Sequence, residues 1–208
     1  MLASAIQRLN DRRHAAGDIG EDAGFTLIEL MVVLLILAIL LAIAIPTFLG
    51  VTKTANDRAV QSNLNTALVN AKAQYQNNSQ TYPTSANLVT ALTTAEPSLS
   101  FTTGTSSSQS QISVFVPSAT AATAGQGVIL AGLSKNGNNC WYIVDNATQM
   151  TITDVPYIAL HGYTPDASAP GTFYGVQKAA GSTNCTAGTI AATGTGNSFQ
   201  GNGFPPTP

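Results

Sequence analysis

Side chains that could do acid–base, nucleophilic or metal chemistry are few in this 208-residue sequence. From Phe25 onward it contains one histidine, His161. The acidic residues over the same range are Glu29, Asp57, Glu96, Asp145, Asp154 and Asp166. No two of these residues stand at the helical spacing of a metal site, and no nucleophile motif is present. The sequence therefore predicts that the protein is not an enzyme and needs no cofactor.

Two groups of side chains could still form a binding site. Asp145, Asp154 and Asp166 could in principle gather around calcium, but their wide spacing without a ligand loop favours solvated turn residues. One aromatic set could stack on single-stranded DNA or fill the core of a sheet. It consists of Trp141, Tyr142, Tyr157, Tyr163, Phe173 and Tyr174. Because few Lys or Arg residues accompany this set, we expect no nucleic-acid binding by this chain alone.

Charge is unevenly distributed along the chain, although the formal net charge is only −2. The first 24 residues hold seven charged side chains, whereas residues 30–52 hold none. Beyond residue 73 the chain is rich in Thr, Ser, Asn, Gly and Ala, a neutral polar composition that suits an exported protein. In such a protein Cys140 and Cys185 favour one disulfide, the alternative being two unrelated thiols.

Residues 30–49 are long and apolar enough to cross a membrane, because twenty helical residues cover about 30 Å. A secretory signal would have a short basic start and a small-residue cleavage site, and this segment has neither in the expected place. Arg8, Arg12 and Arg13 precede the segment, so we expect the N-terminus to remain in the cytoplasm. Pro46 removes one backbone donor and should kink the helix.

Glu29 stands at the head of this apolar segment, where a carboxylate is costly. Deep in a bilayer the cost is about 2.5–3.5 kcal/mol, and near the start of a helix the dipole offsets part of it. One interpretation places Glu29 at the level of the lipid head groups without any role. The other gives the segment a second role after it leaves the membrane, in which the carboxylate is used.

The stretch GFTLIELMVVLLILAILLAIAIP, residues 24–46, closely resembles the N-terminal segment of type IV prepilins. The resemblance rests on Gly24, on the run from Phe25 to Glu29, and on the apolar helix that contains Pro46. It implies that a membrane-embedded prepilin peptidase cleaves between Gly24 and Phe25 and that Phe25 becomes N-methylated. It also implies that Glu29 pairs with the Phe25 ammonium of a neighbouring subunit inside a filament.

The resemblance further implies an α+β pilin fold, in which a long N-terminal helix packs on a small antiparallel sheet. Apolar residues at three- and four-residue spacings predict that the helix continues to about Asn77, with Asp57, Arg58 and Lys72 on its polar side. We expect one short helix near residues 88–93. Strand patterns occupy residues 111–117, 127–133, 140–145, 150–160 and 172–178. A Cys140–Cys185 bond would tie the C-terminal segment to the sheet, as in pilins.

These elements predict how the chain is organised. The expected parts are a cleaved leader (1–24), a transmembrane and filament-core helix (25–50), an amphipathic half of the same helix (51–78), a variable connecting loop (79–110), a sheet head closed by the disulfide (111–185) and a flexible Gly-, Thr- and Pro-rich tail (186–208).

The function that the resemblance implies is that of a structural subunit, a major pilin, of a type IV pilus that supports adhesion, twitching motility or DNA uptake. The alternatives are a pseudopilin of a type II secretion system and a minor or competence pilin. The expected partners are further copies of the chain in a helical filament, the prepilin peptidase, the inner-membrane assembly platform and the membrane. The chain would be a single-pass plasma-membrane protein before assembly and part of an extracellular pilus afterwards.

Overall fold

The computed structural model describes residues 25–118, 122–135, 138–150, 169–177, 185–188 and 198–205. The expected leader with Gly24 lies outside these residues, and so does all but Met150 of the strand expected at 150–160. Among the residues with expected roles, Asp154, Tyr157, His161, Tyr163 and Asp166 also lie outside them. The chain divides into two compact units, Met1–Thr47 and Phe48–Pro208.

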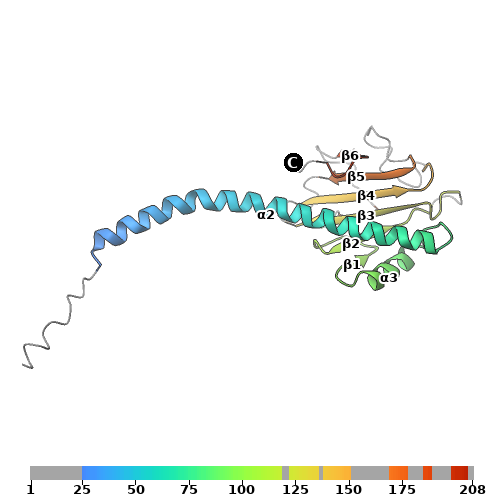
Figure 1. Cartoon of the computed structure of the whole chain (residues 1–208), viewed down its shortest axis with the longest axis horizontal. Coiled ribbons are helices and arrows are strands. Elements are labelled where there is room, and N and C mark those ends of the chain that lie inside the picture. Colours follow the sequence, from blue (N-terminus) through green and yellow to red (C-terminus); the bar gives the residue numbers. More distant parts are fainter. Residues whose placement is uncertain are drawn as a thin grey trace, which may run out of the picture. The chain divides into compact units, whose positions relative to one another are not determined.

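Helix α2 (Leu27–Asn77) is a single helix of 51 residues, as the sequence predicts (Figure 1). Pro46 lies inside it, and the chain stays helical across this residue. Next to it the Thr47 Oγ1 hydroxyl donates to the carbonyl oxygens of Ile43 and Ala44, at 3.1 and 2.9 Å. From Asp57 onward the helix buries one face, because its apolar residues then recur every three or four positions.

The described strands form one sheet in the order of the sequence (Figure 1). They are β1 (Ser100–Thr102), β2 (Gln111–Phe115), β3 (Gly127–Ser134), β4 (Asn139–Asn146), β5 (Gly171–Gln177) and β6 (Ser198–Gln200). Strand β1 pairs with β2 in parallel, and all other pairs are antiparallel. The α+β class is therefore confirmed, and four expected strands appear within a residue or two of their predicted bounds.

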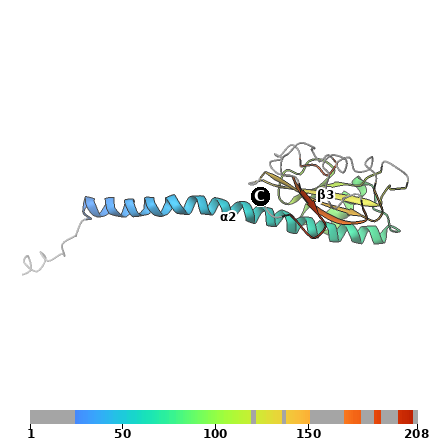
Figure 2. The ribbon, with the colours of Figure 1, turned by 90° about the horizontal axis from the view of Figure 1, so that it is seen from above.

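Both faces of the sheet are covered. On one face the second half of α2 lies along the sheet (Figure 2). Together with helix α3 (Ser85–Ala95) it encloses a core with Leu64, Leu92 and Trp141. Close approach of α2 to β3 requires Gly132, because a Cβ there would lie 2.7 Å from Val60 Cγ1. On the other face a second cluster surrounds Cys140 and Cys185, whose disulfide is confirmed with Cα atoms 5.3 Å apart. The disulfide thus ties the C-terminal segment to the first residues of β4.

Three of the aromatic residues on the strands, Trp141, Tyr142 and Phe173, fill the core rather than form a stacking surface. Trp141 and Tyr142 are fully buried, and Phe173 is almost so. Burial raises the pKa of the Tyr142 phenol. Of the two interpretations that the sequence left open for this set, the structure supports core packing for these residues. Because all three side chains are buried, they present no surface on which the bases of a nucleic acid could stack.

The expected loop at 79–110 contains more regular structure than its composition suggested. Helix α3 is 11 residues long and begins before the short helix expected near residues 88–93. Strand β1 follows it and was not predicted, because three residues of mixed polarity carry too little pattern to identify. Leu88 and Leu92, four residues apart on α3, are fully buried and hold this helix against the sheet.

The expectation of a flexible tail needs correction for residues 198–205. Strand β6 pairs with β5, and Phe204 then packs edge-on against Trp141 and Tyr174, with ring centroids 5.6 and 4.9 Å apart. Gly203 adopts a positive φ of 108°, which an L side chain rarely adopts, so the chain can turn and bring Phe204 back to the sheet. Composition predicted flexibility, but the pairing of β6 with β5 and the ring contacts of Phe204 hold residues 198–205 against the sheet.

We predict that Phe204→Ala releases the C-terminal segment while the disulfide-closed sheet remains folded. The change removes two edge-to-face ring contacts, each worth about 0.5–1.5 kcal/mol. Hydrogen–deuterium exchange of the detergent-solubilised chain, followed by mass spectrometry, should then show faster exchange of the β6 amides. Asn202→Ala, at an exposed position of the same segment, is the matched control and should exchange like the unmodified chain. Equal exchange in all three chains would contradict the anchoring role of Phe204.

Candidate functional site

The N-terminus of α2 is closed by a reciprocal pair of side chains. Glu29 Oε2 accepts hydrogen bonds from the Thr26 backbone N–H (2.9 Å) and from the Thr26 hydroxyl (2.7 Å). In return the Glu29 N–H points back to Thr26, 3.1 Å from its carbonyl oxygen and 3.3 Å from its hydroxyl. This is a capping box, and the Thr-x-x-Glu spacing from Thr26 to Glu29 could have revealed it in the sequence.

The capping box leaves half of the carboxylate unused. Both side-chain bonds end on Oε2, and Oε1 accepts no hydrogen bond within the described part of the chain. Phe25, just before the box, has a side chain that is 86% exposed. The geometry therefore brings Phe25 and Glu29 together at one end of α2, with a free anionic oxygen beside them.

The apolar part of α2 is not covered by any described residue of this chain. Its large side chains, from Leu27 to Val51, are between 48% and 77% exposed. By length and composition α2 is the one helix among the described residues that could cross a membrane. An apolar surface of this extent needs lipid or other protein around it. Pro46 lies on this segment, seventeen positions after Glu29 along the same helix.

Asp57 does not lie on the solvent side of α2 as its type predicted. It is only 3% exposed and accepts a hydrogen bond from the Trp141 indole N–H at 3.0 Å. The Asn139 side-chain amide donates to both of its carboxylate oxygens, at 3.3 and 3.4 Å. The spacing of apolar residues along α2 is compatible with burial at position 57. A carboxylate is nevertheless expected in solvent when its hydrogen-bond donors, which lie on a distant strand, are not known.

Asp145 is likewise not the solvated turn residue that the sequence favoured. It lies on β4 and forms an ion pair with Lys72 of α2, with 2.9 Å between Nζ and Oδ1. Tyr82 donates its phenolic proton to Asp145 Oδ2 at 2.7 Å, and the Thr172 hydroxyl donates to Oδ1. Burial, together with the negative charge of Asp145, raises the pKa of Tyr82. Asp145 therefore serves as a structural acceptor.

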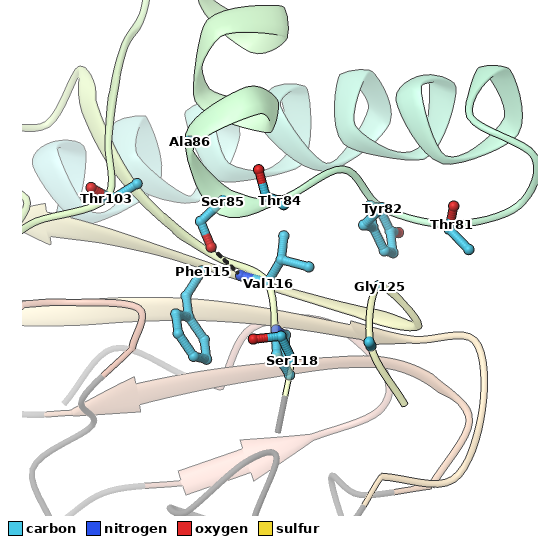
Figure 3. Close-up of a pocket in the computed structure, with 12 residues that line it drawn as sticks. Thr81, Tyr82, Thr84, Ser85, Ala86, Thr103, Phe115, Val116, Ser118 and Gly125 are labelled. Atoms are coloured by element: carbon cyan, nitrogen blue, oxygen red, sulfur yellow. Dashed lines mark hydrogen bonds between the residues drawn. The ribbon is translucent and has the colours of Figure 1, made fainter. Parts of the chain in front are cut away.

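A hollow of about 600 Å³ lies between the start of α3 and the end of β2 (Figure 3). Ser85 Oγ at its wall accepts a hydrogen bond from the Val116 N–H at 2.9 Å. None of its lining residues carries a charge, and their polar side-chain groups are the hydroxyls of Ser, Thr and Tyr residues. Among the described residues no cluster of His, Cys, Asp and Glu could hold a metal ion.

Comparisons with known proteins give one family motif and one relative. The family described as "Prokaryotic N-terminal methylation motif" matches residues 21–45. The chain is also 48% identical, over 59 residues, to "Type IV wide pilus major component PilA4" of Thermus thermophilus. This match covers 28% of the chain and 44% of PilA4, so the chain spans less than half of that relative. No solved structure matches significantly.

The motif falls on the segment that contains Phe25, the capping box and the start of the exposed apolar helix. The motif and the PilA4 match both agree with the resemblance that residues 24–46 carry on their own. The expected recognition is thus confirmed, and the two findings together support a type IV pilin.

Proposed function

We propose that the chain is the structural subunit, the major pilin, of a type IV pilus. The observation that carries this proposal is the exposed apolar segment of α2, which begins at a capped, singly acidic helix start and is followed by a folded head. Such a surface is satisfied first by lipid and then by the same segments of other copies. In the head, the carboxylates of Asp57 and Asp145 are bound to other side chains of the same chain, which supports a structural role rather than an enzymatic one.

Processing would prepare the segment for assembly. We infer that prepilin peptidase cleaves between Gly24 and Phe25 and methylates Phe25, whose exposed position in the described structure is compatible with access. Glycine at the scissile bond would let a protease approach the backbone closely. The subunit would then wait in the plasma membrane, N-terminus on the cytoplasmic side, until the inner-membrane assembly platform moves it into the filament.

Within the filament, Glu29 would have two partners at once. Its Oε2 caps its own helix through Thr26, while its free Oε1 can accept the Phe25 ammonium of a neighbouring subunit. A charge buried in an apolar bundle is strongly penalised when unpaired and tolerated when paired. Glu29 would therefore favour subunits that enter in step with their neighbours, while Pro46 marks a bend or a loosened turn within the packed segment.

The processing part of the proposal is tested by mass spectrometry of protein sheared from the cell surface. We expect a chain that begins at methylated Phe25 and is about two mass units lighter than the reduced chain, because forming one disulfide removes two hydrogens. Reduction of a second sample provides the control for the mass difference. An intact chain from Met1 that stays with the membrane would contradict both cleavage and export.

The assembly part is tested at Glu29. Glu29→Val should preserve membrane insertion, because it makes the segment more apolar, but should abolish or strongly reduce sheared filaments. Val33→Leu, an apolar exchange one turn further along the exposed segment, is the matched control and should assemble normally. The measurements are the amount of chain in the membrane fraction and in the sheared fraction. Normal filament yield from Glu29→Val would refute the proposed pairing.

A further inference from the structure

Two polar groups tie α2 to the sheet, and they lie at opposite ends of the same strand. The first group, here called the Asp57 clamp, consists of Asp57 on α2 with Asn139 and Trp141 at the start of β4. The second, the Lys72 clamp, consists of Lys72 on α2 with Asp145 near the end of β4 and Thr172 on β5. Between the clamps, the buried residues of α2 are apolar except Gln61, whose Oε1 accepts a hydrogen bond from Arg58 on the same helix.

The two clamps match one another in length. Asp57 and Lys72 are fifteen residues apart, which is about 22 Å along an α-helix. Asn139 and Asp145 are six residues apart, which is about 20 Å along a strand. Helix and strand therefore run side by side over this distance, and each end of the contact is marked by a hydrogen-bonded carboxylate. Both clamps can form together at only one position of the helix along β4.

The apolar residues of α2 between the clamps are less selective for one position of the helix along β4. Val60, Leu64 and Leu68 follow one another at intervals of four residues, so a slide by one helical turn brings Leu64 to the place of Val60 and Leu68 to that of Leu64. Ala71 would likewise replace Ala67, another alanine. These exchanges keep an apolar residue at each of these sites, and cores tolerate such exchanges if volume is roughly kept.

The polar residues oppose the same slide. Gln61 would arrive opposite Trp141 in place of the carboxylate, and Gln76 would replace Lys72 beside Asp145. Lys72 itself would move into the buried site of Leu68, where an ammonium without a partner is heavily penalised. Buried polar groups add little net stability compared with apolar residues, but they can select one register among several. In this structure the apolar residues of α2 allow a slide by one turn and the polar residues oppose it, as expected if the polar residues select the register.

We propose that the Asp57 and Lys72 clamps are positioning groups that hold every copy of the subunit in one register of α2 on the sheet, as uniform assembly requires. This inference rests on the proposed filament function. A slide of one turn moves the sheet by about 6 Å along α2. In a filament whose subunits touch through both the apolar segment and the head, both sets of contacts are satisfied only when all copies share one register.

The test uses the full chain with Asp57→Leu, Trp141→Phe and Lys72→Met, a combination called the clamp-free variant. Trp141→Phe removes the indole donor that Asp57→Leu alone would leave unpaired in the core, and Lys72→Met removes the charge that prevents the slide. Asn139 and Asp145 each lose a partner in this variant, so we expect some loss of thermal stability. We expect normal processing and a loss of sheared filaments of roughly tenfold or more, beyond what the loss of stability explains.

A control and a rescue separate register from general stability. Leu130→Ala, in the β3 core, lowers stability without touching either clamp, and its filament yield should fall only as far as its folded fraction does. Adding Val60→Cys and Gly132→Cys to the clamp-free variant should restore filaments. A Cβ at position 132 would lie next to the side chain at position 60, so this disulfide fixes the native register covalently.

The outcomes distinguish this inference from the proposed function. Filament loss in the clamp-free variant that exceeds its loss of stability, and that the disulfide reverses, supports the register role. Normal filaments from the clamp-free variant would overturn the register role and leave the pilin proposal intact. The register role would also be overturned if the filament yield of the clamp-free variant fell only in proportion to its thermal stability, as expected for Leu130→Ala. Absence of filaments from the unmodified chain would overturn both.

Discussion

The exclusion of apolar surface from water is the constraint on which the rest of this structure depends. The first half of α2 presents leucine, isoleucine and valine on every side and has no cover within the described chain. A helix satisfies its own backbone groups, so it can pass between lipid and a bundle of similar helices without losing hydrogen bonds. What it cannot do is stand alone in water. The folded head, the Thr26–Glu29 capping box and the carboxylate of Glu29 are all attached to a helix that must keep its apolar surface out of water.

Much of the fold could be predicted from the sequence, because the relevant signals are local. The long helix follows from an uninterrupted apolar run joined to a three-and-four periodicity that ends near Asn77. Strands β2 to β5 follow from short β-rich runs between turn residues. The disulfide was expected from an even cysteine count and from the resemblance to pilins. The N-terminal motif, with Phe25 and Glu29, was legible for the same reason: its residues are contiguous.

Apart from the local capping box of Thr26 and Glu29 and the short strand β1, the features that sequence reasoning missed depend on partners far away in the chain. Asp57 is a core residue only because Trp141 and Asn139, more than eighty positions later, supply its donors. Asp145 is an ion-pair partner only because α2 brings Lys72 to it. Phe204 stands in a stretch whose composition is typical of a loose tail, yet its ring contacts Trp141. Composition and periodicity describe a residue's own neighbourhood, whereas these roles arise from tertiary contacts.

One further consequence follows from α2 belonging to both compact units of the chain. A pulling force that reached the head through the apolar segment would meet no loop on its way. The load would pass along the ladder of backbone hydrogen bonds in a single helix. That ladder is weakest at Pro46, which has no N–H to offer the carbonyl four residues earlier. At the neighbouring turn the Thr47 hydroxyl donates hydrogen bonds to the carbonyl oxygens of Ile43 and Ala44. Under tension, lengthening of α2 would begin near Pro46.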